Sequence, residues 1–183
     1  MKRFVALIDD DTVGLNFHIT ELRIAGFIVE LFSSAFEIRS ILDGTLPTPP
    51  DFFVIDLMMP SHDLFPDEPP GTSFHAGLIV ARDLRARYAS TPIVVWSSIP
   101  QSDLRATAAR HSAELPLCIF ASKHDISPWD LTRIVTRYFE SGELKLPERP
   151  PSFWRRLWRA ITLRPSFAGV GIDIKKLSDD RNI

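Results

Sequence analysis

Residues 52–60 of this chain read Phe-Phe-Val-Ile-Asp-Leu-Met-Met-Pro, and the rest of the sequence is organised around them. Four apolar residues lead to a single carboxylate, Asp56. A continuous apolar run of this kind is typical of a strand covered on both faces, as in parallel α/β sheets. Pro60 cannot donate a hydrogen bond to a neighbouring strand, so the strand ends before it. Asp56 is therefore predicted at the carboxyl end of a central strand, where open α/β sheets bind ligands.

The composition narrows the class of protein. A length of 183 residues predicts one domain with room for an appendage, and 45% hydrophobic with 24% charged residues indicates a globular protein. The single cysteine, Cys118, excludes an internal disulfide and a cysteine-rich zinc site, and is predicted to pack as a small apolar residue. The apolar run at residues 4–8 is shorter than that of a secretory signal, and nothing approaches a membrane span. We therefore expect a cytoplasmic protein.

The charge is unevenly distributed along the chain. Residues 1–144 contain 12 Lys and Arg against 19 Asp and Glu, whereas residues 145–183 contain 9 against 4. An acidic body followed by a basic tail predicts two functional parts, at 1–144 and 145–183.

Hydrophobic patterns predict five strands that alternate with five helices. The strands are expected at residues 3–8, 27–32, 52–56, 92–98 and 117–121. The first helix is expected to be capped by Asp11 or Thr12. Ser34 with Glu37 predicts a capping box for the second, and Ser127 begins the last. This alternation predicts an α/β fold with a doubly wound parallel sheet.

A long loop, residues 61–76, interrupts the pattern directly after the central strand. Loops of more than about 12–15 residues are usually functional or disordered. Its acidic and histidine residues do not follow a metal-ligand spacing; they are His62, Asp63, Asp67, Glu68 and His75. We interpret the loop instead as a proline-stiffened flap beside the site.

Polar side chains follow four of the predicted strands. They are Asp9 and Asp10 after the first strand, Asp56 at the third, Ser97 and Ser98 at the fourth, and Lys123 after the fifth. Three carboxylates in one crevice repel one another unless a cation joins them, and an open site with oxygen ligands suits Mg²⁺. A lysine and a hydroxyl opposite them suit a phosphoryl group. Asp56 is then a candidate nucleophile that forms an aspartyl-phosphate.

Residues 2–143 resemble the receiver domain of two-component response regulators. The residues that carry the resemblance are Asp9-Asp10-Asp11 after the first strand, Asp56 followed by Leu57-Met58-Met59-Pro60, Ser97 and Ser122-Lys123. The resemblance implies a flavodoxin-like five-stranded sheet of order 2-1-3-4-5. It also implies a signalling domain rather than an enzyme. Such a domain accepts phosphate from a histidine kinase, a phosphotransfer protein or a small phosphodonor.

The resemblance also implies roles for individual residues. Asp10, Asp56 and the Met58 carbonyl would ligate Mg²⁺, and Asp9 would assist through water. Lys123 would bind a phosphate oxygen, and Ser97 would turn toward another. Phe120 stands where the family places a switch aromatic, although plain core packing explains it equally well.

The sequence also departs from the family's pattern. The residue after the lysine is His124 rather than the usual proline, which leaves open whether the Lys123–His124 bond is cis or trans. The 61–76 loop is longer than in typical receivers, and the tail is too short for a usual DNA-binding output domain, so no DNA binding is expected.

Other functions remain as alternatives. The chain could be a receiver-like interaction module that takes no phosphate, or a Mg²⁺-dependent phosphohydrolase or nuclease. A haloacid-dehalogenase-like phosphatase needs an aspartate two residues after the nucleophile, where Met58 stands here. A dinucleotide-binding domain needs a glycine-rich first turn, where this chain has Asp9-Asp10-Asp11.

The tail after the proline-rich stretch at 147–151 predicts an amphipathic helix at about 152–164 and a short strand at about 170–175. The helix would carry two tryptophans, Trp154 and Trp158, on one face. We expect this tail to make protein contacts, either on its own receiver or with a second copy as a homodimer. A membrane surface is the weaker alternative. The sequence does not identify the cognate kinase or the output partner.

Overall fold

The computed structural model describes residues 2–59, 64–65 and 76–147. Its sheet has five parallel strands in the order β2-β1-β3-β4-β5, as the sequence predicts. The strands are β1 (Phe4–Ile8), β2 (Ile28–Phe32), β3 (Phe52–Asp56), β4 (Ile93–Ser97) and β5 (Cys118–Ser122). The doubly wound α/β fold is thereby confirmed.

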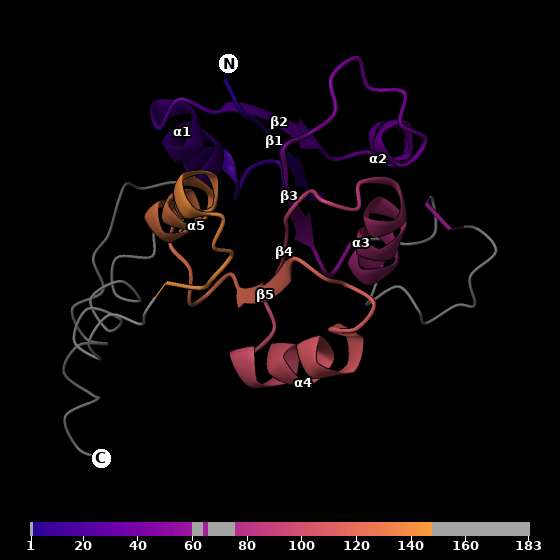
Figure 1. Cartoon of the computed structure of the whole chain (residues 1–183), viewed down its shortest axis with the longest axis vertical. Helices are drawn as coiled ribbons and strands as arrows, with labels where there is room; N and C mark the ends of the chain where they lie inside the picture. Colours follow the sequence, from indigo (N-terminus) through magenta and orange to yellow (C-terminus); the bar gives the residue numbers. More distant parts are fainter. Residues whose placement is uncertain (1, 60–63, 66–75, 148–183) are drawn as a thin grey trace, which may run out of the picture. The chain divides into compact units, whose positions relative to one another are not determined.

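Helices cover both faces of this sheet (Figure 1). They are α1 (Asn16–Ile24), α2 (Ala35–Leu42), α3 (Ala76–Arg87), α4 (Gln101–His111) and α5 (Pro128–Ser141). Figure 1 shows α1 beside α5 on one side of the sheet, and α2 beside α3 on the other. Among the described residues, no helix is both long and apolar enough to span a membrane.

Two hydrophobic clusters form the core, one on each face of the sheet. Because successive strand residues point to opposite faces, Phe53 and Ile55 pack with α2, α3 and α4, whereas Val54 packs with α1 and α5. All five residues of β3 are buried, which explains its uninterrupted apolar sequence.

Two helix starts follow the predicted capping chemistry. The Ser34 hydroxyl accepts a hydrogen bond from the Glu37 amide, while the Glu37 carboxylate accepts one from the Ser34 amide. Ser127 and Asp130 make the same reciprocal pair at α5, and Gly142 ends that helix in the left-handed conformation at φ 73°.

The predicted cap of α1 is wrong. The helix begins at Asn16, its N-cap residue is Leu15, and no side chain caps it. The Asp11 carboxylate instead accepts a hydrogen bond from the Gly14 amide at 2.8 Å, in a turn that precedes the helix. This local side-chain bond competes with helix formation, so the helix starts later than the sequence indicates.

Most of the 61–76 loop and all of the predicted tail helix and strand lie outside the described residues. Within the loop, Leu64 is buried in the core, and its carbonyl accepts a hydrogen bond from the Arg39 guanidinium of α2 at 3.4 Å. Ala76, the last residue of the predicted loop, is the first residue of α3.

Candidate functional site

The carboxyl ends of the central strands meet at one edge of the sheet and hold the predicted site residues. Backbone hydrogen bonds join these ends: the Leu57 amide donates to the Trp96 carbonyl at 2.9 Å, and the Lys123 amide to the Ser97 carbonyl at 2.7 Å. The ends of β3, β4 and β5 are thus held side by side. The positions of Asp56, Ser97 and Lys123 are therefore set by the hydrogen-bonded backbone of the sheet.

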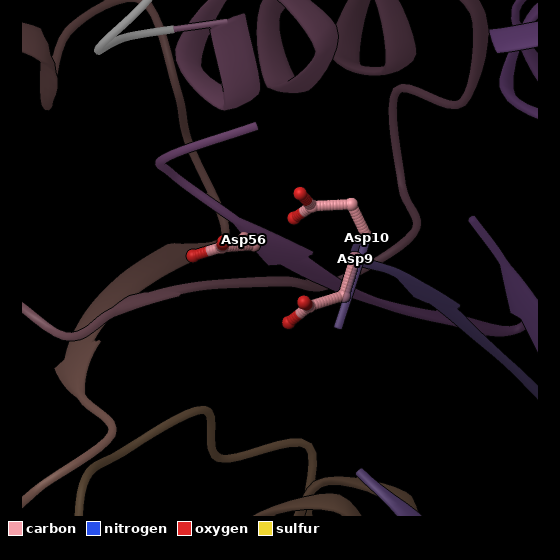
Figure 2. Close-up of side chains that lie close together, drawn as sticks. All are labelled: Asp9, Asp10 and Asp56. Carbon is pink, nitrogen blue, oxygen red and sulfur yellow. The ribbon is translucent and has the colours of Figure 1, made fainter. Parts of the chain in front are cut away.

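Three carboxylates converge at this edge. Asp9, Asp10 and Asp56 each place one oxygen so that the three atoms lie within 4.8 Å of one another (Figure 2). Asp9 and Asp56 are buried, whereas Asp10 is exposed. Such a cluster has one open side, which suits a cation that keeps some of its waters.

Asp56 lacks a hydrogen bond at one of its two carboxylate oxygens. Its Oδ1 atom is buried and makes no hydrogen bond within the described part of the chain. Burial raises the pKa of this carboxyl above its ordinary value, the charge of Asp9 raises it further, and the Lys123 ammonium opposes both effects. The site sets three carboxylates against the single Lys123 ammonium, so a buried oxygen that lacks a hydrogen bond fits a metal ion that would supply further positive charge. Asp56, Asp10 and Asp9 therefore form a donor set suited to Mg²⁺.

Lys123 lies between two of these carboxylates. Its Nζ atom is 2.8 Å from Asp9 Oδ2 and 3.4 Å from Asp56 Oδ1. Only about a fifth of its side chain is exposed, so solvent screens these ion pairs less than pairs on the surface. The structure thus brings Lys123 to the acidic cluster, as the sequence predicts.

Asp9 is held by more donors than the sequence suggests. Its Oδ1 atom accepts a hydrogen bond from the Asp11 amide at 3.0 Å. Its Oδ2 atom accepts one from Lys123 and another from the Trp96 indole Nε1 at 3.2 Å. Sequence reasoning missed Trp96; the available signal was a tryptophan in a fully buried strand, since a buried indole N–H needs an acceptor.

Of the remaining predicted site residues, Ser97 is the last residue of β4, Phe120 is the third residue of β5, and Met58 follows the end of β3 by two residues. Ser97 is fully buried, and its hydroxyl accepts a weak hydrogen bond from the Ile99 amide at 3.4 Å. Phe120 is buried in the cluster that faces α2, α3 and α4, and Met58 is 36% exposed. The Lys123–His124 peptide bond is trans.

Gly77 is a second residue that sequence reasoning did not single out. It lies in the first turn of α3, and its amide donates to the Leu57 carbonyl at 3.2 Å. A Cβ atom at this position would lie 1.9 Å from the carbonyl oxygen of Asp56. The helix can therefore approach the backbone of the phosphoacceptor candidate this closely only because residue 77 lacks a side chain.

The chain is similar in structure to several receiver domains. A response regulator receiver protein from Sinorhizobium medicae is 23% identical, with a TM-score of 0.55; the match covers 78% of this chain and 98% of that one. The BeF3-activated DrrB receiver domain is 16% identical, with a TM-score of 0.56 and coverage of 76% and 99%. The phosphorylated cyanobacterial phytochrome response regulator RcpA is 16% identical, with a TM-score of 0.53 and coverage of 81% and 100%.

By sequence, no protein-family model and no curated protein matches the chain. The structural matches extend over about three quarters of the chain, and the strand order and the placement of the acidic cluster agree with the resemblance seen in the sequence. The chain therefore has the CheY-like fold of response regulator receiver domains.

Proposed function

We propose that this chain is a phosphoacceptor receiver domain in which Asp56 is phosphorylated in a Mg²⁺-dependent reaction. The observation that carries the proposal is the convergence of Asp9, Asp10 and Asp56 at one edge of the sheet, with Lys123 Nζ 3.4 Å from Asp56. The donor would be a histidine kinase, a phosphotransfer protein or a small acyl phosphate.

Asp10 and Asp56 would hold the metal directly, together with the Met58 carbonyl, while Asp9 would act at longer range. The bound metal would neutralise the repulsion between the acids and the incoming phosphoryl group. In the transfer, an Asp56 oxygen forms a bond to phosphorus as the bond from phosphorus to the donor breaks, and the donor leaves with that electron pair.

Lys123 and Ser97 would then bind the transferred group. The ammonium is already in the site, so it needs only to exchange a carboxylate oxygen for a phosphoryl oxygen. The Ser97 hydroxyl, now weakly bonded to the Ile99 amide, would turn toward a second phosphoryl oxygen. That movement, with a rearrangement of Phe120, would alter the surface formed by α4, β5 and α5 and so switch protein contacts.

The experiment is intact-mass spectrometry after incubation with Mg²⁺ and acetyl phosphate. The wild-type chain should gain the mass of one phosphoryl group, Asp56→Asn should gain none, and Asp10→Ala should require much more Mg²⁺. Asp51→Asn is the matched control, because Asp51 bonds to Arg3 and the Phe4 amide at the other end of the strands. If neither acetyl phosphate with Mg²⁺ nor beryllofluoride modifies the wild-type chain, the interaction-module alternative replaces this proposal.

A further inference from the structure

Trp96 is the next-to-last residue of β4 and is 1% exposed. Its side chain lies in the core cluster that faces α1 and α5, while the neighbouring Ser97 is on the alternate face of the strand. Its indole Nε1 donates to Asp9 Oδ2 at 3.2 Å, a bond between residues 87 positions apart. The polar edge of this core residue thus reaches the acidic cluster.

The ring of Trp96 also lies close to Lys123. Lys123 Nζ is 5.3 Å from the ring centroid, within the range of a cation–π interaction, and donates to the same Asp9 oxygen as the indole. Trp96 therefore contacts both members of the Asp9–Lys123 ion pair, one through its N–H group and the other through its π system.

The indole is itself fixed from α1. The ring of His18 packs against it edge-on, with centroids 4.9 Å apart. Burial, assisted by the charge of Lys123, lowers the pKa of His18 to about 4, so this imidazole is neutral at pH 7. Trp96 thus packs against a neutral aromatic ring and is shielded from solvent.

We propose that Trp96 is a positioning residue for the site: it fixes Asp9 Oδ2 and, through Asp9 and its own ring, holds Lys123 beside Asp56. The effect on phosphorylation rests on the proposed function, whereas the effect on the ion pair does not. Because Asp9 already accepts bonds from Asp11, Trp96 and Lys123, direct ligation of a metal falls to Asp10 and Asp56.

Trp96→Phe is the informative substitution, because phenylalanine keeps an aromatic ring in the core but has no N–H donor. Asp9 is 1% exposed, so bulk water has little access to replace the lost donor. A buried carboxylate that loses a hydrogen bond is destabilised more than an exposed one.

The first test is a double-mutant cycle between Trp96→Phe and Asp9→Ala, measured by urea unfolding in EDTA without any phosphodonor. In the wild-type background, Trp96→Phe should lower the folding equilibrium constant at least about tenfold more than in the Asp9→Ala background. If Trp96 only fills space, the loss will be the same in both backgrounds, and the proposal is wrong. This readout does not depend on whether Asp56 accepts phosphate.

The second test is the initial rate of Asp56 phosphorylation at saturating Mg²⁺. Trp96→Phe should reduce the rate roughly tenfold, as is common for residues that orient a catalytic group. Val94→Ala is the control, since Val94 is buried on the same strand and the same face but two residues farther from the site. Equal rates for Trp96→Phe and Val94→Ala would contradict the positioning role, even if the folding cycle shows coupling. If no variant, wild type included, is phosphorylated while the cycle shows coupling, the proposed function fails and the ion-pair role of Trp96 stands.

Discussion

Replacing Gly77 by alanine tests whether the close approach of α3 to the end of β3 outweighs helix propensity. In an ordinary helix, Gly→Ala raises the free energy of unfolding by about 0.4–1 kcal/mol. Here the added Cβ would lie 1.9 Å from the Asp56 carbonyl oxygen and 2.7 Å from Leu57 Cα, and both are backbone atoms that cannot rotate away. The helix or the strand end must therefore shift by about 1 Å or more.

Overpacking of this kind costs about 1–3 kcal/mol, so we expect a net loss of about 1–2 kcal/mol in Gly77→Ala. The assay is urea unfolding of the metal-free protein, with Ala86→Gly as the control. Ala86 is exposed in the same helix, so its replacement measures propensity alone and should cost about 1 kcal/mol. A Gly77→Ala protein that is as stable as wild type, or more stable, would refute the reasoning.

Three further outcomes follow from the electrostatics and the buried hydrogen bonds. Burial and the charge of Asp9 raise the pKa of Asp56 above its ordinary value, and together they outweigh the attraction of Lys123, whose Nζ lies 3.4 Å away. Asp56→Asn should thus stabilise the metal-free protein by about 1–2 kcal/mol in urea unfolding; a loss of stability would contradict this balance. The pKa of His18 is lowered from 6.5 to about 4, so the unfolded chain binds a proton first as the pH falls. The wild type should lose on the order of 3 kcal/mol relative to His18→Phe between pH 7 and pH 4, and parallel stability curves would contradict it. Arg85→Met should cost about 2–3 kcal/mol, because the buried guanidinium donates to three carbonyls between α3 and β5, those of Tyr88, Ala89 and Leu117. An exposed control, Arg87→Met, should change thermal stability little.

The sequence predicted the sheet because its signals are local. A buried strand such as β3 is recognisable from its own residues, and capping at Ser34 and Ser127 depends on side chains three positions apart. Once the strands are predicted to be parallel, their carboxyl ends are expected at one edge of the sheet. The convergence of Asp9, Asp10 and Asp56 could therefore be predicted from the sequence.

The residues that sequence reasoning missed depend on contacts across the fold. Trp96 reads as an ordinary buried aromatic until its face of the sheet is known, and only then does its N–H group reach Asp9. In the sequence, Gly77 only marks the start of a helical pattern. Its role in the close approach of that helix to the end of β3 is a tertiary property, so the sequence alone does not show it. The start of α1 was misplaced because the Asp11–Gly14 turn competes with the helix over only a few residues.

The pairing of α1 with α5 has a consequence for synthesis of the chain. Leu15, Ile19 and Leu22 belong to a core cluster that also requires Leu131, Ile134 and Val135 of α5. During translation these partners emerge more than a hundred residues later, so the apolar face of α1 stays uncovered while the strands of the sheet are being made. The opposite face receives its helices, α2, α3 and α4, before β5 is complete. Until α5 has emerged from the ribosome, the nascent chain therefore exposes the apolar face of α1, and exposed apolar surface of this kind promotes aggregation and is the reason chaperones are needed.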